Sequence, residues 1–238
     1  MKAVFHKEKS LAIAWDASRL EKPAAESFDA GFWKSRQALA GEAIGRGSAW
    51  FIDAPFGRAV LRRYLRGGWA AKLSRNRYVY TTVERSRPFK EFHLLADLYK
   101  LELPVPRPMA ALCEHSGLFS TGAIMTARIE AAQTLADSLA GTGGGSEHKL
   151  WNSVGVCIRR FHDAGVWHAD LNARNILLDP EGQVYLIDFD RAVYSPEKAV
   201  AGKNNLERLK RSLHKICMAK ELPQMESAWV QLVRGYHG

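Results

Sequence analysis

The chain has 238 residues, enough to bury a sizeable core, and its 47% hydrophobic and 25% charged residues are typical of a folded soluble protein. Lysine and arginine number 34 against 25 aspartates and glutamates, and the resulting net charge of +9 attracts anions. The sequence has no zinc-ligand spacing, RNA-binding signature or long Lys/Arg block. We therefore expect an anionic membrane surface rather than nucleic acid as a partner.

The cysteines and the N-terminus indicate the compartment. Cys113, Cys157 and Cys217 are odd in number and far apart, which favours free thiols in a reducing environment. Residues 1–10 carry alternating charge and lack the apolar run of a signal peptide. No window approaches the roughly 20 apolar residues of a spanning helix. We expect a cytoplasmic protein that is peripheral to a membrane.

Residues 1–40 are weakly patterned, with Phe28, Phe32 and Trp33 as expected packing anchors before the first recognisable sheet. A G-x-G step follows at Gly45 and Gly47. Glycines at this spacing turn tightly and let backbone N–H groups approach phosphates. A plain hairpin turn explains the same pattern equally well.

Residues 59–64 read A-V-L-R-R-Y and predict a strand. Protein kinases end the strand V-A-I-K with a lysine that holds nucleotide phosphates, and Arg62 occupies the matching position. Arginine can grip phosphate through two parallel hydrogen bonds. Arg63, on the opposite strand face, and Lys72, in a basic segment farther on, remain alternatives for this role.

A helix is predicted from Arg87, with proline at its start and an inward stripe of Phe92, Leu95 and Leu98. Glu91 falls where kinases have the helix glutamate that pairs with the phosphate-binding cation. Residues 103–108 (L-P-V-P-R-P) predict an extended connector, followed by strands near residues 110–113 and 123–126. The second strand leads to an expected hinge at about residues 127–130, whose backbone would meet adenine.

Residues 149–164 predict an amphipathic helix with Gly165 as its C-terminal cap. His162 is expected to be structural, packed behind the loop that follows. That loop and its surroundings, residues 166–190, read V-W-H-A-D-L-N-A-R-N-I-L-L-D-P-E-G-Q-V-Y-L-I-D-F-D.

This segment has the layout of a kinase-like phosphotransfer centre, with His168, Asp170 and Asn175 in the spacing H-x-D-L-x-x-x-N. Phosphoryl transfer needs a carboxylate to orient and deprotonate the acceptor hydroxyl, and oxygen ligands to hold magnesium against the nucleotide phosphates. Asp170 fits the first role, and Asn175 and Asp188 fit the second. His168 is expected to organise the loop by hydrogen bonds rather than to carry protons.

A hairpin is predicted between the two metal ligands, with strands at residues 176–178 and 184–187 and a turn at residues 179–182. It would return the chain so that Asp188 faces Asp170 and Asn175. Asp190 replaces the glycine of D-F-G, which favours a small-molecule kinase over a regulated protein kinase. Only two helical stretches follow, near residues 204–220 and 226–236, too little for a protein-substrate platform.

These elements predict an α+β protein-kinase-like bilobal fold with a small antiparallel-sheet N-lobe and a trimmed, mainly helical C-lobe. We place the lobe boundary at the hinge, with residues 1–127 in the N-terminal lobe and residues 128–238 in the C-terminal lobe.

The assembled motifs resemble the 3-deoxy-D-manno-octulosonic acid (Kdo) kinase family of lipopolysaccharide core kinases, within the protein-kinase-like superfamily. The matching pieces run over most of the chain. They are G-R-G, V-L-R-R-Y-x-R-G-G, L-S-R-N-R-Y, L-P-V-P-R-P, H-A-D-L-N-A-R-N-I-L-L-D, L-I-D-F-D-R and, over residues 205–213, N-L-x-R-L-x-R-S-L.

The resemblance implies phosphorylation of the 4-hydroxyl of a Kdo residue on lipid A precursor, with ATP and Mg²⁺, at the cytoplasmic face of the inner membrane. It supports Asp170 as base and Asn175 and Asp188 as metal ligands, and it places Asn172 where protein kinases often have lysine. A heptose kinase of the same pathway and a nucleotide-binding pseudokinase are the alternatives.

Overall fold

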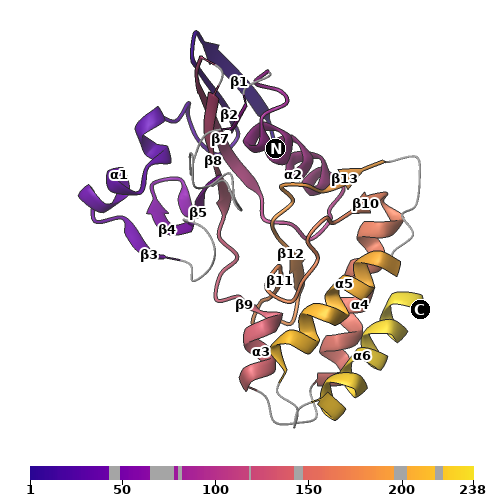
Figure 1. The fold of residues 1–238 in the computed structure, drawn as a ribbon. Helices are drawn as coiled ribbons and strands as arrows, with labels where there is room; N and C mark the ends of the chain where they lie inside the picture. Colours follow the sequence, from indigo (N-terminus) through magenta and orange to yellow (C-terminus); the bar gives the residue numbers. More distant parts are fainter. Residues whose placement is uncertain are drawn as a thin grey trace. The chain divides into compact units, whose positions relative to one another are not determined.

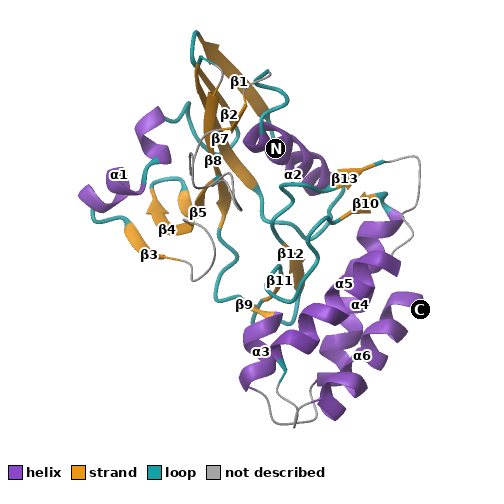
Figure 2. Ribbon diagram, viewed as in Figure 1, coloured by secondary structure: helices purple, strands orange, loops and turns teal. Residues whose placement is uncertain are grey.

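The computed structural model describes residues 1–42, 49–64, 78–79, 82–117, 119–141, 147–195, 203–217 and 222–238. The chain divides into two compact units, Met1–Lys100 with Pro106–Arg128, and Leu101–Val105 with Ile129–Gly238 (Figure 1). The first unit is built on a β-sheet and the second is mainly helical (Figure 2). The predicted α+β class is therefore confirmed.

The first unit contains an antiparallel sheet in the strand order β1-β2-β7-β8-β5-β4-β3, with β6 paired to β8. The predicted strand at residues 59–64 corresponds to β5, and those near residues 110–113 and 123–126 lie within the longer β7 and β8. The strands are β1 Ala3–Glu8, β2 Leu11–Asp16, β3 Leu39–Glu42, β4 Ala49–Ala54, β5 Gly57–Arg63, β6 Tyr78–Val79, β7 Pro108–Ser116 and β8 Phe119–Ala127.

The expectation that the sheet begins only after residue 40 is wrong. β1 and β2 form an antiparallel hairpin, with Ala3 opposite Asp16 and Glu8 opposite Leu11. β1 lies at the end of the strand order and is largely exposed, so its sequence has little reason to alternate between apolar and polar residues. β2 is largely buried, and a short apolar run does not by itself separate strand from helix.

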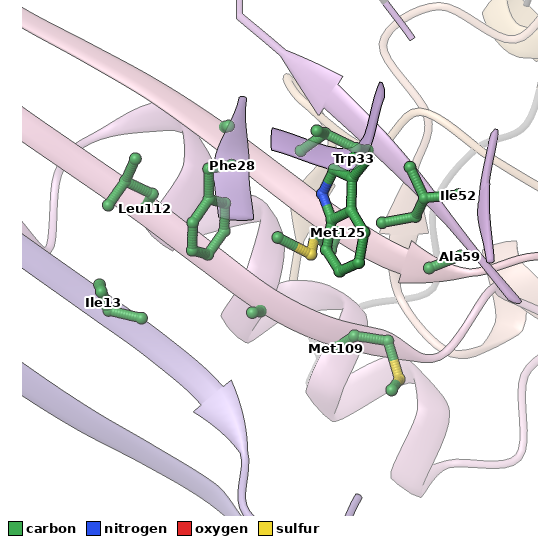
Figure 3. Packing of buried hydrophobic residues seen from close by; sticks show 11 residues of the cluster. Ile13, Phe28, Trp33, Ile52, Ala59, Met109, Leu112 and Met125 are labelled. Carbon is green, nitrogen blue, oxygen red and sulfur yellow. The ribbon is translucent and has the colours of Figure 1, made fainter. Parts of the chain in front are cut away.

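The core of the first unit fixes the strand that carries Arg62. Phe28 and Trp33 lie in this core, as predicted, with 1% and 4% of their surface exposed (Figure 3). Phe32 is partly buried and packs against the core. Phe28 ends the short 3₁₀ helix η1 (Ala25–Phe28), and Trp33 lies on α1 (Ala30–Ser35). Leu61 of β5 is fully buried in the same core. Because neighbouring strand residues face opposite sides, Arg62 projects from the other face of the sheet.

Helix α2 (Arg87–Lys100) packs against β7 and β8. Its predicted inward stripe of Phe92, Leu95 and Leu98 is confirmed, because none of the three is more than 1% exposed. The helix approaches the sheet closely at Gly122 of β8, where an added Cβ would lie 2.6 Å from Cγ of Pro88.

The second unit contains four helices and two small antiparallel sheets among its described residues. The predicted helices at residues 149–164, 204–220 and 226–236 correspond to α4, α5 and α6. The elements are β9 Gln133–Thr134, α3 Leu135–Gly141, α4 Glu147–Asp163, β10 Val166–Trp167, β11 Ile176–Leu178, β12 Val184–Leu186, β13 Val193–Tyr194, α5 Lys203–Ile216 and α6 Leu222–His237.

The predicted connector at residues 103–108 is shared between the units. The main-chain N–H of Leu186 donates to the carbonyl of Pro104 at 3.0 Å, and Arg160 donates to the carbonyl of Glu102 at 2.9 Å. These bonds tie Leu101–Val105 to the helical unit, whereas Pro108 begins β7. No helix in the described ranges has both the length and the apolar character that a membrane span requires.

Helices α4 and α6 lie side by side in backbone contact (Figure 1). A Cβ at Gly155 of α4 would lie 2.0 Å from the carbonyl oxygen of Leu232, and a Cβ at Gly235 of α6 would lie 2.1 Å from that of Asn152. Both clashes are with backbone, which cannot rotate away as a side chain would. The two glycines therefore set the distance between the helices.

We expect Gly155→Ala to lower the free energy of unfolding by about 1–3 kcal/mol, because the helices must move apart to admit the methyl group. Urea denaturation would measure this loss. The neighbouring Val156 is 45% exposed, so Val156→Ala serves as a control and should change stability by no more than about 0.5 kcal/mol. Equal stability of the Gly155→Ala variant and the wild type would contradict the packing described here.

Candidate active site

The predicted hairpin after the H-x-D-L-x-x-x-N loop is present as β11 and β12, with Ile176 opposite Leu186. At its open end the N–H of Ile187 donates to the carbonyl of Asn175 at 3.0 Å. Asp188 is the next residue. The hairpin therefore brings Asn175 and Asp188, the two predicted metal ligands, to the same end of one small sheet.

The loop is closed on itself by two asparagine side chains. The amide nitrogens of Asn172 and Asn175 donate to the main-chain carbonyl of Asp170 at 2.8 and 2.9 Å. The side-chain oxygen of Asn172 also accepts from the N–H of Arg174 at 2.9 Å. These bonds fix the backbone at Asp170, from which its carboxylate projects.

Asp188 has a φ of +66°, a left-handed conformation that is uncommon for residues other than glycine. The next residue, Phe189, is 1% exposed and anchors the segment. Its ring stacks on Phe161 of α4 with centroids 5.7 Å apart and meets the ring of His168 edge-on at 4.9 Å. Buried packing thus maintains an unusual backbone at a predicted ligand, as occurs at functional sites.

His168 has the organising contacts that its motif position predicts. Its Nδ1 accepts from the N–H of Asp170 at 3.2 Å, so the ring proton lies on Nε2, which donates to the carbonyl of Ile187 at 2.9 Å. The accepting carbonyl belongs to the residue before D-F-D. Burial lowers the pKa of His168, which keeps the ring neutral. The ring therefore links the loop to the end of β12.

A buried residue that the sequence analysis did not single out holds the same loop. Asn205 of α5 is 0% exposed and donates to the carbonyl of His168 at 2.8 Å, while its side-chain oxygen accepts from the N–H of His168 at 3.2 Å. The same oxygen lies 3.1 Å from Nε2 of His162, whose Nδ1 lies 2.8 Å from the hydroxyl of Tyr236. His162 is thus structural, as predicted.

One face of α5 contacts the loop of residues 168–175 at three points. Asn205, Arg208 and Ser212 are three and four residues apart, so they project from the same side of the helix. Asn205 contacts His168 and Arg208 contacts Asp170, and the hydroxyl of Ser212 accepts from the N–H of Ala173 at 3.2 Å. The sequence signal was the motif N-L-x-R-L-x-R-S-L, which contains these three residues among its four polar positions.

Arg208 forms an ion pair with Asp170, the predicted base. Its Nε lies 3.1 Å from Oδ1 of Asp170, and its Nη2 contacts the same oxygen. The two side chains are 47% and 53% exposed. An ion pair this open to solvent contributes about 0–1 kcal/mol to stability.

The first unit contains the predicted pair of Arg62 and Glu91. Arg62 of β5 forms an ion pair with the carboxylate of Glu91 on α2, and the hydroxyl of Tyr64 donates to the same oxygen at 2.5 Å. Glu91 is only 3% exposed. Arg63 instead contacts Asp29 at 3.0 Å. Lys72, the other alternative to Arg62, lies outside the described residues. Gly45 and Gly47, the glycines of the predicted phosphate-binding turn, also lie outside them.

The predicted magnesium ligands are two residues rather than a cluster. Across the described ranges, no three His, Cys, Asp or Glu side chains gather as a protein-only metal site would require. Magnesium is commonly held by one or two carboxylates together with substrate phosphates. The carboxylate of Asp188 and the amide oxygen of Asn175, at one end of the hairpin, fit that donor set.

The buried histidines predict a loss of stability in mild acid. Burial lowers the pKa of both His162 and His168, whereas an unfolded histidine has a pKa of about 6.5. Below that pH the unfolded chain binds more protons than the folded chain, so the free energy of unfolding falls as the pH decreases. Denaturation between pH 7.5 and 5.5 should show this slope, and His162→Gln should reduce it.

Tyr236→Phe is the matched control, because it removes the hydroxyl bonded to His162 but keeps the titrating ring. It should lower stability and retain the pH slope. An unchanged slope in His162→Gln would show that His162 is not held neutral by the fold.

Comparison of the sequence with known proteins identifies the same family through a family model and through individual relatives. The model of the lipopolysaccharide kinase (Kdo/WaaP) family matches residues 30–236. A 3-deoxy-D-manno-octulosonic acid kinase of Stenotrophomonas maltophilia R551-3 is 45% identical over 225 residues, which cover 94% of this chain and 89% of that protein. The enzyme of the same name from Xanthomonas euvesicatoria pv. vesicatoria 85-10 is 44% identical over the same shares. The chain therefore belongs to the lipopolysaccharide kinase (Kdo/WaaP) family.

Proposed function

We propose that this protein is a Kdo kinase, which transfers the γ-phosphoryl group of ATP to a hydroxyl of a 3-deoxy-D-manno-octulosonic acid residue. Relatives that are 43–45% identical over 94% of the chain carry that name. The structural observation that carries the proposal is the Asp170 loop, which the side chains of His168, Asn172 and Asn175 hold in one conformation.

Asp170 is the proposed base. Its carboxylate accepts a hydrogen bond from the acceptor hydroxyl, orients the oxygen toward the phosphoryl group and takes up the proton as transfer proceeds. Asn172 and Asn175 keep the backbone of Asp170 fixed during this step. Asn175 and Asp188 would hold Mg²⁺, which neutralises charge on the nucleotide phosphates when bound.

Arg62 is the proposed ligand of the nucleotide phosphates. The pair of Glu91 and Tyr64 fixes its side chain, and a guanidinium presents donors that match phosphate oxygens. The Glu91 carboxylate is buried, and an unpaired buried charge is costly. Glu91 therefore needs the positive charge of Arg62 beside it.

The hydroxyl that is phosphorylated and the place of reaction are proposed from the net charge and from the family. We propose the 4-hydroxyl of Kdo on lipid A precursor as the acceptor and the cytoplasmic face of the inner membrane as the place of reaction. A net charge of +9 supports binding to an anionic lipid surface, and screening restricts this attraction to about 8 Å at physiological salt. The enzyme would then meet its substrate as a peripheral protein at the membrane.

Transfer of labelled γ-phosphate from ATP and Mg²⁺ to lipid A precursor with and without Kdo tests the proposal. Incorporation should require Kdo, and Asp170→Asn should lower turnover by about 10²–10⁴-fold because the general base is lost. Asp163→Asn, which breaks an exposed ion pair with Arg159, is the control and should remain active. Nucleotide binding without transfer to the Kdo lipid would favour a heptose acceptor first and a pseudokinase second.

A second experiment separates Arg62 from Arg63 as the phosphate ligand. Glu91→Gln removes the charge that holds Arg62, so kcat/KM for ATP should fall by about 10–100-fold, the value of one charge-assisted hydrogen bond. Asp29→Asn removes the carboxylate that contacts Arg63 and still allows asparagine to cap α1. Its kinetics should match those of the wild type, and a selective effect of Asp29→Asn would assign the phosphates to Arg63 instead.

A further inference from the structure

The backbone contacts of α5 place Arg208 beside the proposed base. Asn205, one turn before Arg208, binds the backbone of His168, and Ser212, one turn after it, binds the N–H of Ala173. These two anchors lie on either side of Asp170 in the loop. Arg208 is therefore held at a defined position relative to Asp170, unlike an arginine on a freely exposed helix.

The position of Arg208 puts a positive charge next to the reacting hydroxyl. A general base must lie within hydrogen-bond distance of the proton that it removes. The acceptor hydroxyl therefore binds the Asp170 carboxylate, which already contacts Nε and Nη2 of Arg208 through Oδ1. A guanidinium has five N–H donors in a planar fork, so one that contacts Asp170 through two nitrogens retains further donors for a second carboxylate.

The proposed acceptor carries a carboxylate at a suitable place. In Kdo the acid group is attached to the ring carbon that is two positions from the carbon bearing the 4-hydroxyl. A sugar that presents this hydroxyl to Asp170 thus brings its carboxylate close to the same end of the site. Arginine is also the cation best suited to bind a planar carboxylate through two parallel hydrogen bonds.

We propose that Arg208 binds the carboxylate of the acceptor sugar and makes the enzyme select an acidic sugar. This inference rests on the proposed function and names the group that reads the substrate. The half-exposed pair with Asp170 leaves the guanidinium open to an incoming anion. On binding, the sugar acid shares the fork with Asp170, so recognition of the acid and orientation of the hydroxyl occur together.

The experiment compares two acceptors with the full-length enzyme. One is Kdo-bearing lipid A precursor dispersed in detergent, and the other is the same lipid with the Kdo carboxyl converted to a carboxamide. The wild type should prefer the acid by about 10–100-fold in kcat/KM, as expected for a hydrogen-bonded charge pair. Arg208→Gln should lower the rate on the acid by about this factor more than it lowers the rate on the amide, so that the preference for the acid disappears.

Two further variants separate recognition from general effects. Arg211, on the same helix, is exposed, so Arg211→Gln should keep the full preference for the acid. Arg208→Lys retains the positive charge but lacks the planar guanidinium, so it should keep part of the preference for the acid. Circular dichroism should show that all variants are folded.

The results distinguish the inference from the proposed function. If Arg208→Gln lowers the rate equally on acid and amide, Arg208 only orients Asp170. The inference then fails, but the proposed Kdo kinase function is unaffected. If the variant keeps the wild-type preference, another residue reads the acid. If the wild type transfers phosphate to neither lipid, the proposed function itself fails and this inference fails with it.

Discussion

The loop of residues 168–175 depends on the hydrogen bonds of the buried Asn205 side chain. A buried amide is costly unless its donors and acceptor are satisfied, and here the main chain of His168 supplies both a donor and an acceptor. His162 and Tyr236 extend the network, so α4, α5 and α6 are linked behind the loop. The packing of these three helices and the backbone of the loop are therefore linked by one hydrogen-bond network.

The protein arranges charge differently in its two units. In the first unit the carboxylate of Glu91 is buried and held by Arg62 and Tyr64, so the pair is rigid and costly to break. In the second unit the carboxylate of Asp170 is half-exposed and its partner Arg208 is equally accessible. The buried pair agrees with the proposed role of Arg62 as a phosphate ligand, and the exposed pair agrees with the proposed binding of a substrate carboxylate by Arg208.

Local pattern was sufficient where local interactions form the structure. The hairpin of β11 and β12 followed from two short apolar runs around a turn that contains Gly182, whose φ is +80°. The buried stripe of α2 followed from helical spacing. The pairing of Glu91 with Arg62 joins residues 29 apart along the chain, and it was predicted from the positions that kinase motifs assign to them rather than from local pattern. The assigned roles of Asp170, Asn175 and Asp188 in phosphoryl transfer come from motif spacing and remain predictions.

The sequence by itself determined the fold class, the family and the order of the motifs, because hydrophobic period, turn residues and motif spacing are properties of neighbouring residues. Only the tertiary structure placed β1 and β2 in the sheet, since an exposed end strand need not show an apolar period. The tertiary structure also brought Asn205 and Arg208 onto the loop. Arg208 lies 38 residues from Asp170 along the chain. The motif on α5 marks a polar helix face, but only the docking of the helix shows what that face contacts.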